Sequence, residues 1–344
     1  MTSEDSLPQK YAYAWSADSE LSLPDFLKKY KPSMVQNDTS NSKPWIWVQK
    51  GAPSREDTGA AEALEAGAAL LEATSERVEE IKNDASIPAR SSKKTGAKGK
   101  KEVREEVQAE ATEKFKDIAI KHGFVSGKWL SFAPADKVDV IWASLAKSLV
   151  EGPLAATSAF RVKVATSPEN GNASQHLICI YIPDVYDKDA VTEVMKVLLR
   201  NHGMNLSGVK SNMYTALGID SKHPSGLQST TWKTTAILSD SESKALKEAY
   251  FEELAEAKEA AKKAPKPDKP AGDAKAKAKP QLKKKQAEDD PFGSDDDEDE
   301  EEAQRKAEVK SKKAPPKAAK RAKDSSDEDS EEEERPKKKK AGKK

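Results

Sequence analysis

Apolar residues at the spacing of strands and helices are concentrated in one stretch of the chain, residues 127–238. Within it, short apolar runs such as FRVKVAT and HLICIYIPD alternate with two amphipathic segments. Elsewhere charged, Ala-rich and Pro-rich segments dominate, and over the whole chain 34% of the residues are charged and only 6% aromatic. Because a compact core requires buried apolar side chains, we expect the fold to be built around this stretch.

The order of the elements in this stretch predicts an α+β fold. We expect strands at 128–132, 160–166, 176–183, 209–217 and 228–238, and helices at 136–151 and 187–202. The order β-α-β-β-α-β-β is typical of a curved, mostly antiparallel sheet with helices on one face. The opposite face of the sheet would then be free to bind a ligand.

Composition divides the rest of the chain. We expect a partly docked N-terminal segment with a PWIWV strand, an Ala/Glu-rich insertion containing a loose helix and a basic linker, and the α+β domain preceded by its own helix. A helical extension and a disordered polyampholyte tail would follow. These five regions are residues 1–50, 51–105, 106–240, 241–264 and 265–344.

The segment KPWIWV carries two tryptophans at alternating positions. Strand alternation places Trp45 and Trp47 on one face and Ile46 and Val48 on the other. One interpretation is an edge strand that covers the core. The other is that one indole is a stacking surface for a base, because an aromatic face accepts any base.

Alternation also predicts a cationic face on the sheet. In FRVKVAT, Arg161 and Lys163 point to one side, opposite Phe160, Val162 and Val164. Cations interleaved with aromatic rings suit phosphates and bases, although an ordinary solvated face is the alternative. The expected strand 209–217 would also place Asn212 on this face, between Lys210 and Tyr214. The candidate ligand-binding residues are Trp45, Trp47, Arg161, Lys163, Lys210, Tyr214, Trp232 and Lys233.

The sequence contains no recognisable catalytic or metal-binding motif. Its four histidines are scattered and no P-loop, GxSxG or GxGxxG is present, so we expect a protein that is not an enzyme and has no cofactor or metal. His202 is expected to be a helix-terminal residue that suits the helix dipole. The single cysteine, Cys179, lies in an apolar run and is expected to be a buried, inert thiol.

The C-terminal tail suggests nuclear functions, although a plain solubilising tail is the alternative. Basic clusters there suit nuclear import or nucleic-acid contact, and serines before acidic runs suit an acidophilic kinase. The basic residues are Lys320, Arg321, Lys337, Lys338, Lys339 and Lys340, and the serines are Ser294, Ser325, Ser326 and Ser330. We expect a monomer found in nucleus and cytoplasm, with no membrane-spanning segment.

Several motifs, in order, resemble the basophilic leukemia-expressed protein family. They are KPWIWV, HGFVSGKWLSF, VDVIWASLAKSLVEG, RVKVATS, LICIYIPD, DKDAVTEVMKVLLRNHG and YTALGI, within residues 43–48 and 105–238. The resemblance implies a fold similar to the cap-binding translation initiation factors, in which two tryptophans sandwich a methylated guanine and basic residues hold the phosphates.

The loops that would carry that sandwich differ in this chain. They read Ala133-Pro134-Ala135 and Gly152-Pro153-Leu154, without an aromatic residue. Trp129 and Trp142 match framework positions of the family and are expected to pack in the core, whereas Lys163 lies near the phosphate-facing strand.

Three functions follow as hypotheses. The first is a non-catalytic RNA-binding or nucleotide-binding protein. The alternative is a protein-interaction adaptor whose charged tail contacts nuclear partners, and an unrecognised enzyme is a more remote third.

Overall fold

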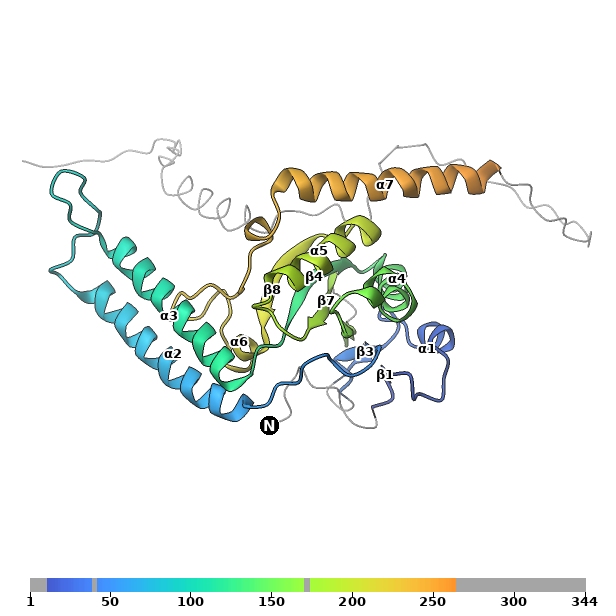
Figure 1. Cartoon of the computed structure of the whole chain (residues 1–344), viewed down its shortest axis with the longest axis horizontal. Helices are drawn as coiled ribbons and strands as arrows, with labels where there is room; N and C mark the ends of the chain where they lie inside the picture. The colour runs from blue at the N-terminus through green and yellow to red at the C-terminus, as the bar shows by residue number, and fades with distance from the viewer. Residues whose placement is uncertain (1–10, 39–41, 170–173, 264–344) are drawn as a thin grey trace, which may run out of the picture. The chain divides into compact units, whose positions relative to one another are not determined.

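The computed structural model describes residues 11–38, 42–169 and 174–263, all within one compact unit, Met1–Gly293. At its centre is a six-stranded sheet in the order β1-β3-β5-β7-β4-β8 (Figure 1). Every pairing in it is antiparallel except that of β1 with β3. The strands are β1 (Ala14–Trp15), β3 (Trp45–Gln49), β4 (Gly127–Pro134), β5 (Arg161–Ala165), β7 (Gln175–Ile182) and β8 (Leu206–Ser211). The α+β prediction is therefore confirmed.

Helices cover one face of this sheet. The α4 and α5 helices pack on it, and α7 lies along the outer side of α5. The helices are α1 (Leu23–Lys29), α2 (Ala60–Asn83), α3 (Lys100–His122), α4 (Val138–Glu151), α5 (Lys188–His202), α6 (Asn212–Ala216) and α7 (Asp240–Lys263). Short elements complete the described fold: β2 (Gln36–Asn37), β6 (Ser167–Pro168), η1 (Pro153–Ala156) and η2 (Thr234–Ala236).

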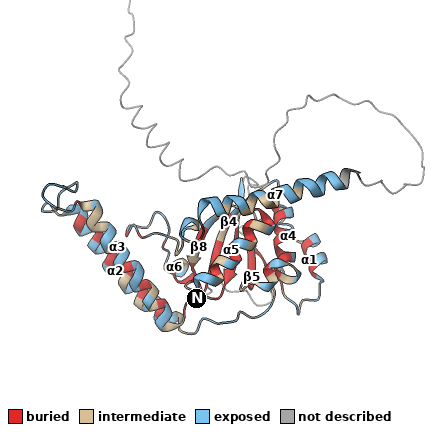
Figure 2. Cartoon of the chain, turned by 45° about the horizontal axis from the view of Figure 1, so that its top comes forward, coloured by how far each residue is buried: buried red, intermediate tan, exposed pale blue. Residues whose placement is uncertain are grey.

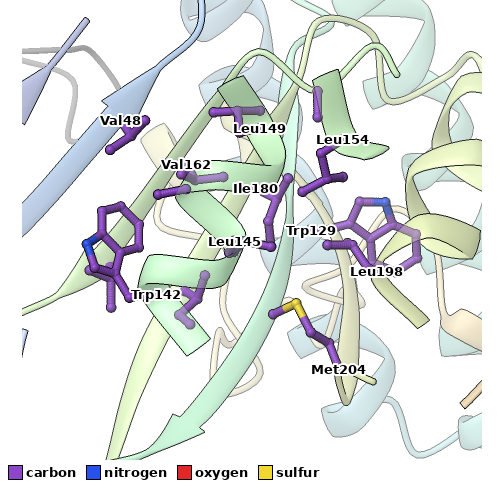
Figure 3. Close-up of a cluster of buried hydrophobic side chains, with 14 of the residues drawn as sticks. Val48, Trp129, Trp142, Leu145, Leu149, Leu154, Val162, Ile180, Leu198 and Met204 are labelled. Carbon is purple, nitrogen blue, oxygen red and sulfur yellow. The ribbon is translucent and has the colours of Figure 1, made fainter. Parts of the chain in front are cut away.

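The main core lies between the sheet and these helices. Alternate strand residues such as Val48, Val162 and Ile180 meet Leu145 and Leu198 there, all fully buried (Figures 2 and 3). This burial follows from the period-2 alternation of the strands and the 3.6-residue period of the helices. Among the described residues, no helix is long and apolar enough to cross a membrane.

Helices α2 and α3 form an antiparallel hairpin. The α3 helix is the one expected before the α+β domain, whereas α2, which was expected to be a loose helix, packs against it. Leu71, Val78 and Ile81 of α2 are buried, as their helical spacing predicts. A second apolar cluster holds the base of the pair, where the Phe115 ring lies 5.5 Å from that of Tyr214. The insertion is thus an ordered part of the fold.

The predictions of the last two strands, at residues 209–217 and 228–238, are partly wrong. Strand β8 ends at Ser211, whose side chain caps α6 by accepting a hydrogen bond from the Met213 N–H at 3.1 Å. Residues 228–238 contain only the isolated bridge Val209↔Trp232 and η2. The serine cap and the burial of Met213 in the second cluster favour a helix over a longer strand.

His202, at the end of α5, is buried against α4. Its Nε2 lies 2.9 Å from the Ser148 hydroxyl and its Nδ1 3.4 Å from the Ser144 hydroxyl. Burial lowers the pKa of His202 from 6.5 to about 4. The residue ends α5, as expected, but at pH 7 it is a neutral core histidine and not a cation that interacts with the helix dipole.

This shift makes stability depend on pH. The unfolded chain takes up the His202 proton near pH 6.5, whereas the folded chain takes it up near pH 4. The contribution of His202 to the free energy of unfolding is therefore fully present above pH 6.5. It is lost as the pH falls towards 4, and the loss amounts to about 3 kcal/mol. Urea unfolding at pH 7.0, 5.5 and 4.5 measures it. His202→Gln should flatten the profile over this range, and an unchanged profile would contradict the assignment.

Candidate functional site

The register of the sheet aligns cations and aromatic rings on the face opposite α4 and α5. Directly opposed residues share a face, and pairing across β3, β5, β7, β4 and β8 aligns Gln49, Arg161, Tyr181, Lys128 and Lys210 in one row. The next row contains Trp47, Lys163, Cys179 and Leu130. We define the cationic sheet face as Trp45, Trp47, Lys128, Arg161, Lys163, Cys179, Tyr181 and Lys210.

Lys163 lies among three aromatic rings of this face. Its ammonium nitrogen is 4.1 Å from the centroid of the Trp45 ring and 4.8 Å from that of Trp47. The Tyr181 ring centroid is 5.5 Å away. The electron-rich faces of these rings stabilise the cation, which compensates in part for its removal from water.

Tyr181 is shared by three cations. The charged groups of Lys128, Arg161 and Lys163 lie 5.5, 5.8 and 5.5 Å from its ring centroid. The Arg161 Nε donates a hydrogen bond of 2.8 Å to Gln49 Oε1. Phe160 also joins this side, 6.3 Å from Tyr181, so its expected grouping with Val162 is wrong. Three positive charges around one ring make this part of the sheet suited to an anion.

The sheet face is more buried than strand alternation implied. Lys163 is 2% exposed and Lys128 is 4% exposed, whereas Trp45, Arg161 and Lys210 are half-buried. The expectation of a free face is therefore wrong for its central lysines. A ligand reaches these lysines only by replacing chain atoms that now surround them.

A hydrogen-bonded network orients the Lys128 end of the face. The Lys128 ammonium donates to Asn212 Oδ1 at 3.4 Å, and Asn212 Nδ2 donates to the Ser126 hydroxyl at 2.7 Å. The Ser126 hydroxyl donates in turn to Asp57, which also accepts the Val125 and Ser126 N–H groups at 3.1 Å. Burial raises the pKa of Asp57, and these hydrogen bonds oppose the rise.

Three predicted site residues lie away from this face. Tyr214 is buried in the second apolar cluster, and burial raises the pKa of its phenol to about 12. Trp232 packs against the main core and donates its indole N–H to the Val185 carbonyl at 2.7 Å. Lys233 is exposed at the start of η2. The sequence pattern predicts all three on strands of the sheet, but the fold has α6 and a loop in place of those strands.

Trp45 and Trp47 lie together on the face, as predicted, but their strand is not at the edge of the sheet. Strand β1 pairs with β3 on the outer side, with Ala14 opposite Trp47. The Trp47 and Tyr181 rings are stacked with their centroids 6.0 Å apart. Trp45 is the half-buried indole of the two, and so the one available for stacking.

Trp129 and Trp142 belong to the main core, as expected from their framework positions. They are 0% and 1% exposed and lie among aliphatic side chains of the helix-covered side (Figure 3). Neither indole N–H has a hydrogen-bond partner within the described part of the chain. Both tryptophans therefore contribute to packing.

Other predicted sites lie outside the described residues. They are the phosphorylation candidates Ser294, Ser325, Ser326 and Ser330 and the basic tail residues Lys320, Arg321, Lys337, Lys338, Lys339 and Lys340. Within the described residues, no group of three or more His, Cys, Asp or Glu side chains could hold a metal ion.

Comparison with known families matches residues 2–214 to the family described as Basophilic leukemia-expressed protein Bles03. The match covers more than half of the chain, so the chain belongs to this family. It begins earlier than the resemblance read from the motifs, includes the region of α2 and α3, and ends at Tyr214 instead of residue 238.

Cys179 provides a probe of the face. The residue is 2% exposed and lies between Lys163 and Leu130 in the register, and it is the only cysteine of the chain. We expect a thiol reagent such as DTNB to label the native chain roughly a hundredfold or more slowly than the urea-unfolded chain. Similar labelling rates in the two states would show that the face is open in solution.

Proposed function

We propose that this member of the basophilic leukemia-expressed protein family is a non-catalytic binding protein that holds RNA or a nucleotide on its cationic sheet face. One observation carries the proposal: the sheet register places Lys128, Arg161, Lys163 and Lys210 on the same face as Trp45 and Trp47. No single segment of the sequence contains this combination.

The chemistry of the face fits the two parts of a nucleotide. Lysine and arginine side chains neutralise phosphate oxygens, and this contribution weakens as salt concentration rises. A half-buried indole such as Trp45 can stack on a base, with a contribution of about 1–3 kcal/mol per base. Because stacking tolerates any base, this arrangement supports binding with little sequence preference.

The proposed binding mode differs from a cap sandwich. Trp129 and Trp142 are buried on the helix-covered side of the sheet, and the loops around α4 carry no aromatic residue at Ala133–Ala135 or Gly152–Leu154. The ring available for stacking belongs instead to β3, beside the Lys163 ammonium. We therefore expect capped and uncapped RNA to bind alike.

The test uses two substitutions on the face and two matched controls. Lys163→Met keeps the length of the side chain and removes its charge, and Trp45→Leu removes the stacking surface. Lys233→Met and Trp232→Leu make the same changes away from the face. Filter binding of the full-length chain to single-stranded RNA at several salt concentrations compares the four variants.

We expect Trp45→Leu to weaken RNA binding roughly five- to hundredfold, because the indole supplies stacking energy. We propose that bound RNA displaces the chain atoms around the buried Lys163. Lys163→Met should therefore weaken binding and reduce the salt slope by about 0.7, the value for one contact to single-stranded nucleic acid. The control variants should bind like the unmodified chain. Folded variants that all bind equally would reject the face as the site and favour an adaptor that contacts nucleic acid only through other lysines.

A further inference from the structure

The helical hairpin of α2 and α3 ends in an ordered basic loop. In Figures 1 and 2 the two helices lie side by side, and the residues that connect them lie at the end remote from α6 and β8. At a rise of 1.5 Å per residue, each helix is about 35 Å long. The connection, residues 84–99, is thus presented well away from the sheet.

The hairpin is packed along its length. At its base, α2 approaches α6 so closely that a Cβ on Gly67 would lie 2.5 Å from the Met213 methyl carbon. Near its far end, Val78 and Ile81 are 2% and 0% exposed. The α2 helix has buried residues at both ends and packs against α3, and this packing holds the connecting loop in a defined position.

The connecting loop has its own hydrogen bonds. The Ser92 N–H donates to the Ala97 carbonyl and the Gly96 N–H to the Ser92 carbonyl, both at 2.9 Å. This turn places Gly96 at φ +69°, a conformation that glycine adopts readily. The Gly99 N–H donates to the Ser91 hydroxyl at 2.9 Å, which joins the turn to the start of α3.

The loop is positively charged, whereas α2 below it is acidic. Arg90, Lys93 and Lys94 are exposed, and no hydrogen bond or ion pair joins their side chains to other described residues. Lys98, also exposed, pairs with Glu106 of α3. The exposed side of α2 carries Glu62, Glu65, Glu72, Glu76, Glu79 and Glu80. We define the basic tip as Arg90, Lys93 and Lys94.

We propose that the basic tip binds the phosphate backbone of a nucleic acid, as a second contact for the RNA held on the cationic sheet face. This inference rests on the proposed function. The exposed side of α2 carries six glutamates against Arg77 and Lys82, and this excess of negative charge disfavours contact of a polyanion along that helix. Residues 89–98 contain only Ala, Arg, Ser, Lys, Thr and Gly, which suit phosphate contacts. They include no large apolar anchor of the kind that dominates protein interfaces.

The experiment neutralises the tip in the full-length chain with Arg90→Gln, Lys93→Gln and Lys94→Gln together. The control carries Lys28→Gln, Lys31→Gln and Lys222→Gln, three exposed lysines elsewhere on the fold. Affinity for a single-stranded RNA is measured against salt concentration. We expect the slope of log K against log salt to fall by about 2 for the tip variant, as for three lost phosphate contacts, and to stay unchanged for the control.

A tip variant with the slope of the unmodified chain would overturn the inference, and so would an equal loss in the control. An acidic peptide of matched charge is tested in parallel. If the tip variant loses only the peptide, the partner is an acidic protein and the nucleic-acid assignment is wrong.

Lys163→Met and Trp45→Leu, measured beside the tip variant, separate the two proposals. If the tip variant loses RNA affinity and the face variants do not, only the sheet face is rejected as a site. If the face variants lose RNA affinity and the tip variant does not, only the tip is rejected. A full-length chain that binds no RNA rejects both.

Discussion

The alignment of five neighbouring strands, β3, β5, β7, β4 and β8, is the constraint on which the rest of the structure depends. Because side chains alternate along each strand, the register that buries Val48, Val162 and Ile180 beneath α4 and α5 also places Trp47, Lys163 and Cys179 together on the other face. A slip of one residue in the pairing of any strand would move that strand's buried side chains to the other face of the sheet. The apolar core therefore determines where the cations lie.

The positive charges on this face are stabilised by neighbouring side chains, not by solvent alone. Lys163 has two indoles and a phenol ring within 5.5 Å of its ammonium, and Lys128 is held by an amide that is itself oriented through Ser126 and Asp57. Such contacts reduce the cost of burying a charge and fix its position. A preorganised group of cations loses less side-chain entropy when an anion binds than flexible surface lysines do.

Local periodicity was enough to predict the α+β fold, the helices over the sheet and the opposite orientations of Trp45 and Ile46. It was not enough for Tyr181 and Lys128, because their approach to Arg161 depends on pairing between strands that are far apart in the sequence. Tyr214 and Trp232 were assigned to strands because both lie in apolar runs. The Ser211 cap ends β8 before Tyr214, and the bond from the Trp232 indole to Val185 places that ring against the core.

The site of RNA contact is the most direct test of this account. RNA carrying 4-thiouridine would be photo-crosslinked to the full-length chain, and the crosslinked residues identified by mass spectrometry. We predict crosslinks in β3, β5 or β7, at or beside Trp45, Lys163 and Tyr181. Crosslinks confined to other parts of the chain, with none on these strands, would contradict the assignment of the cationic sheet face as the binding site.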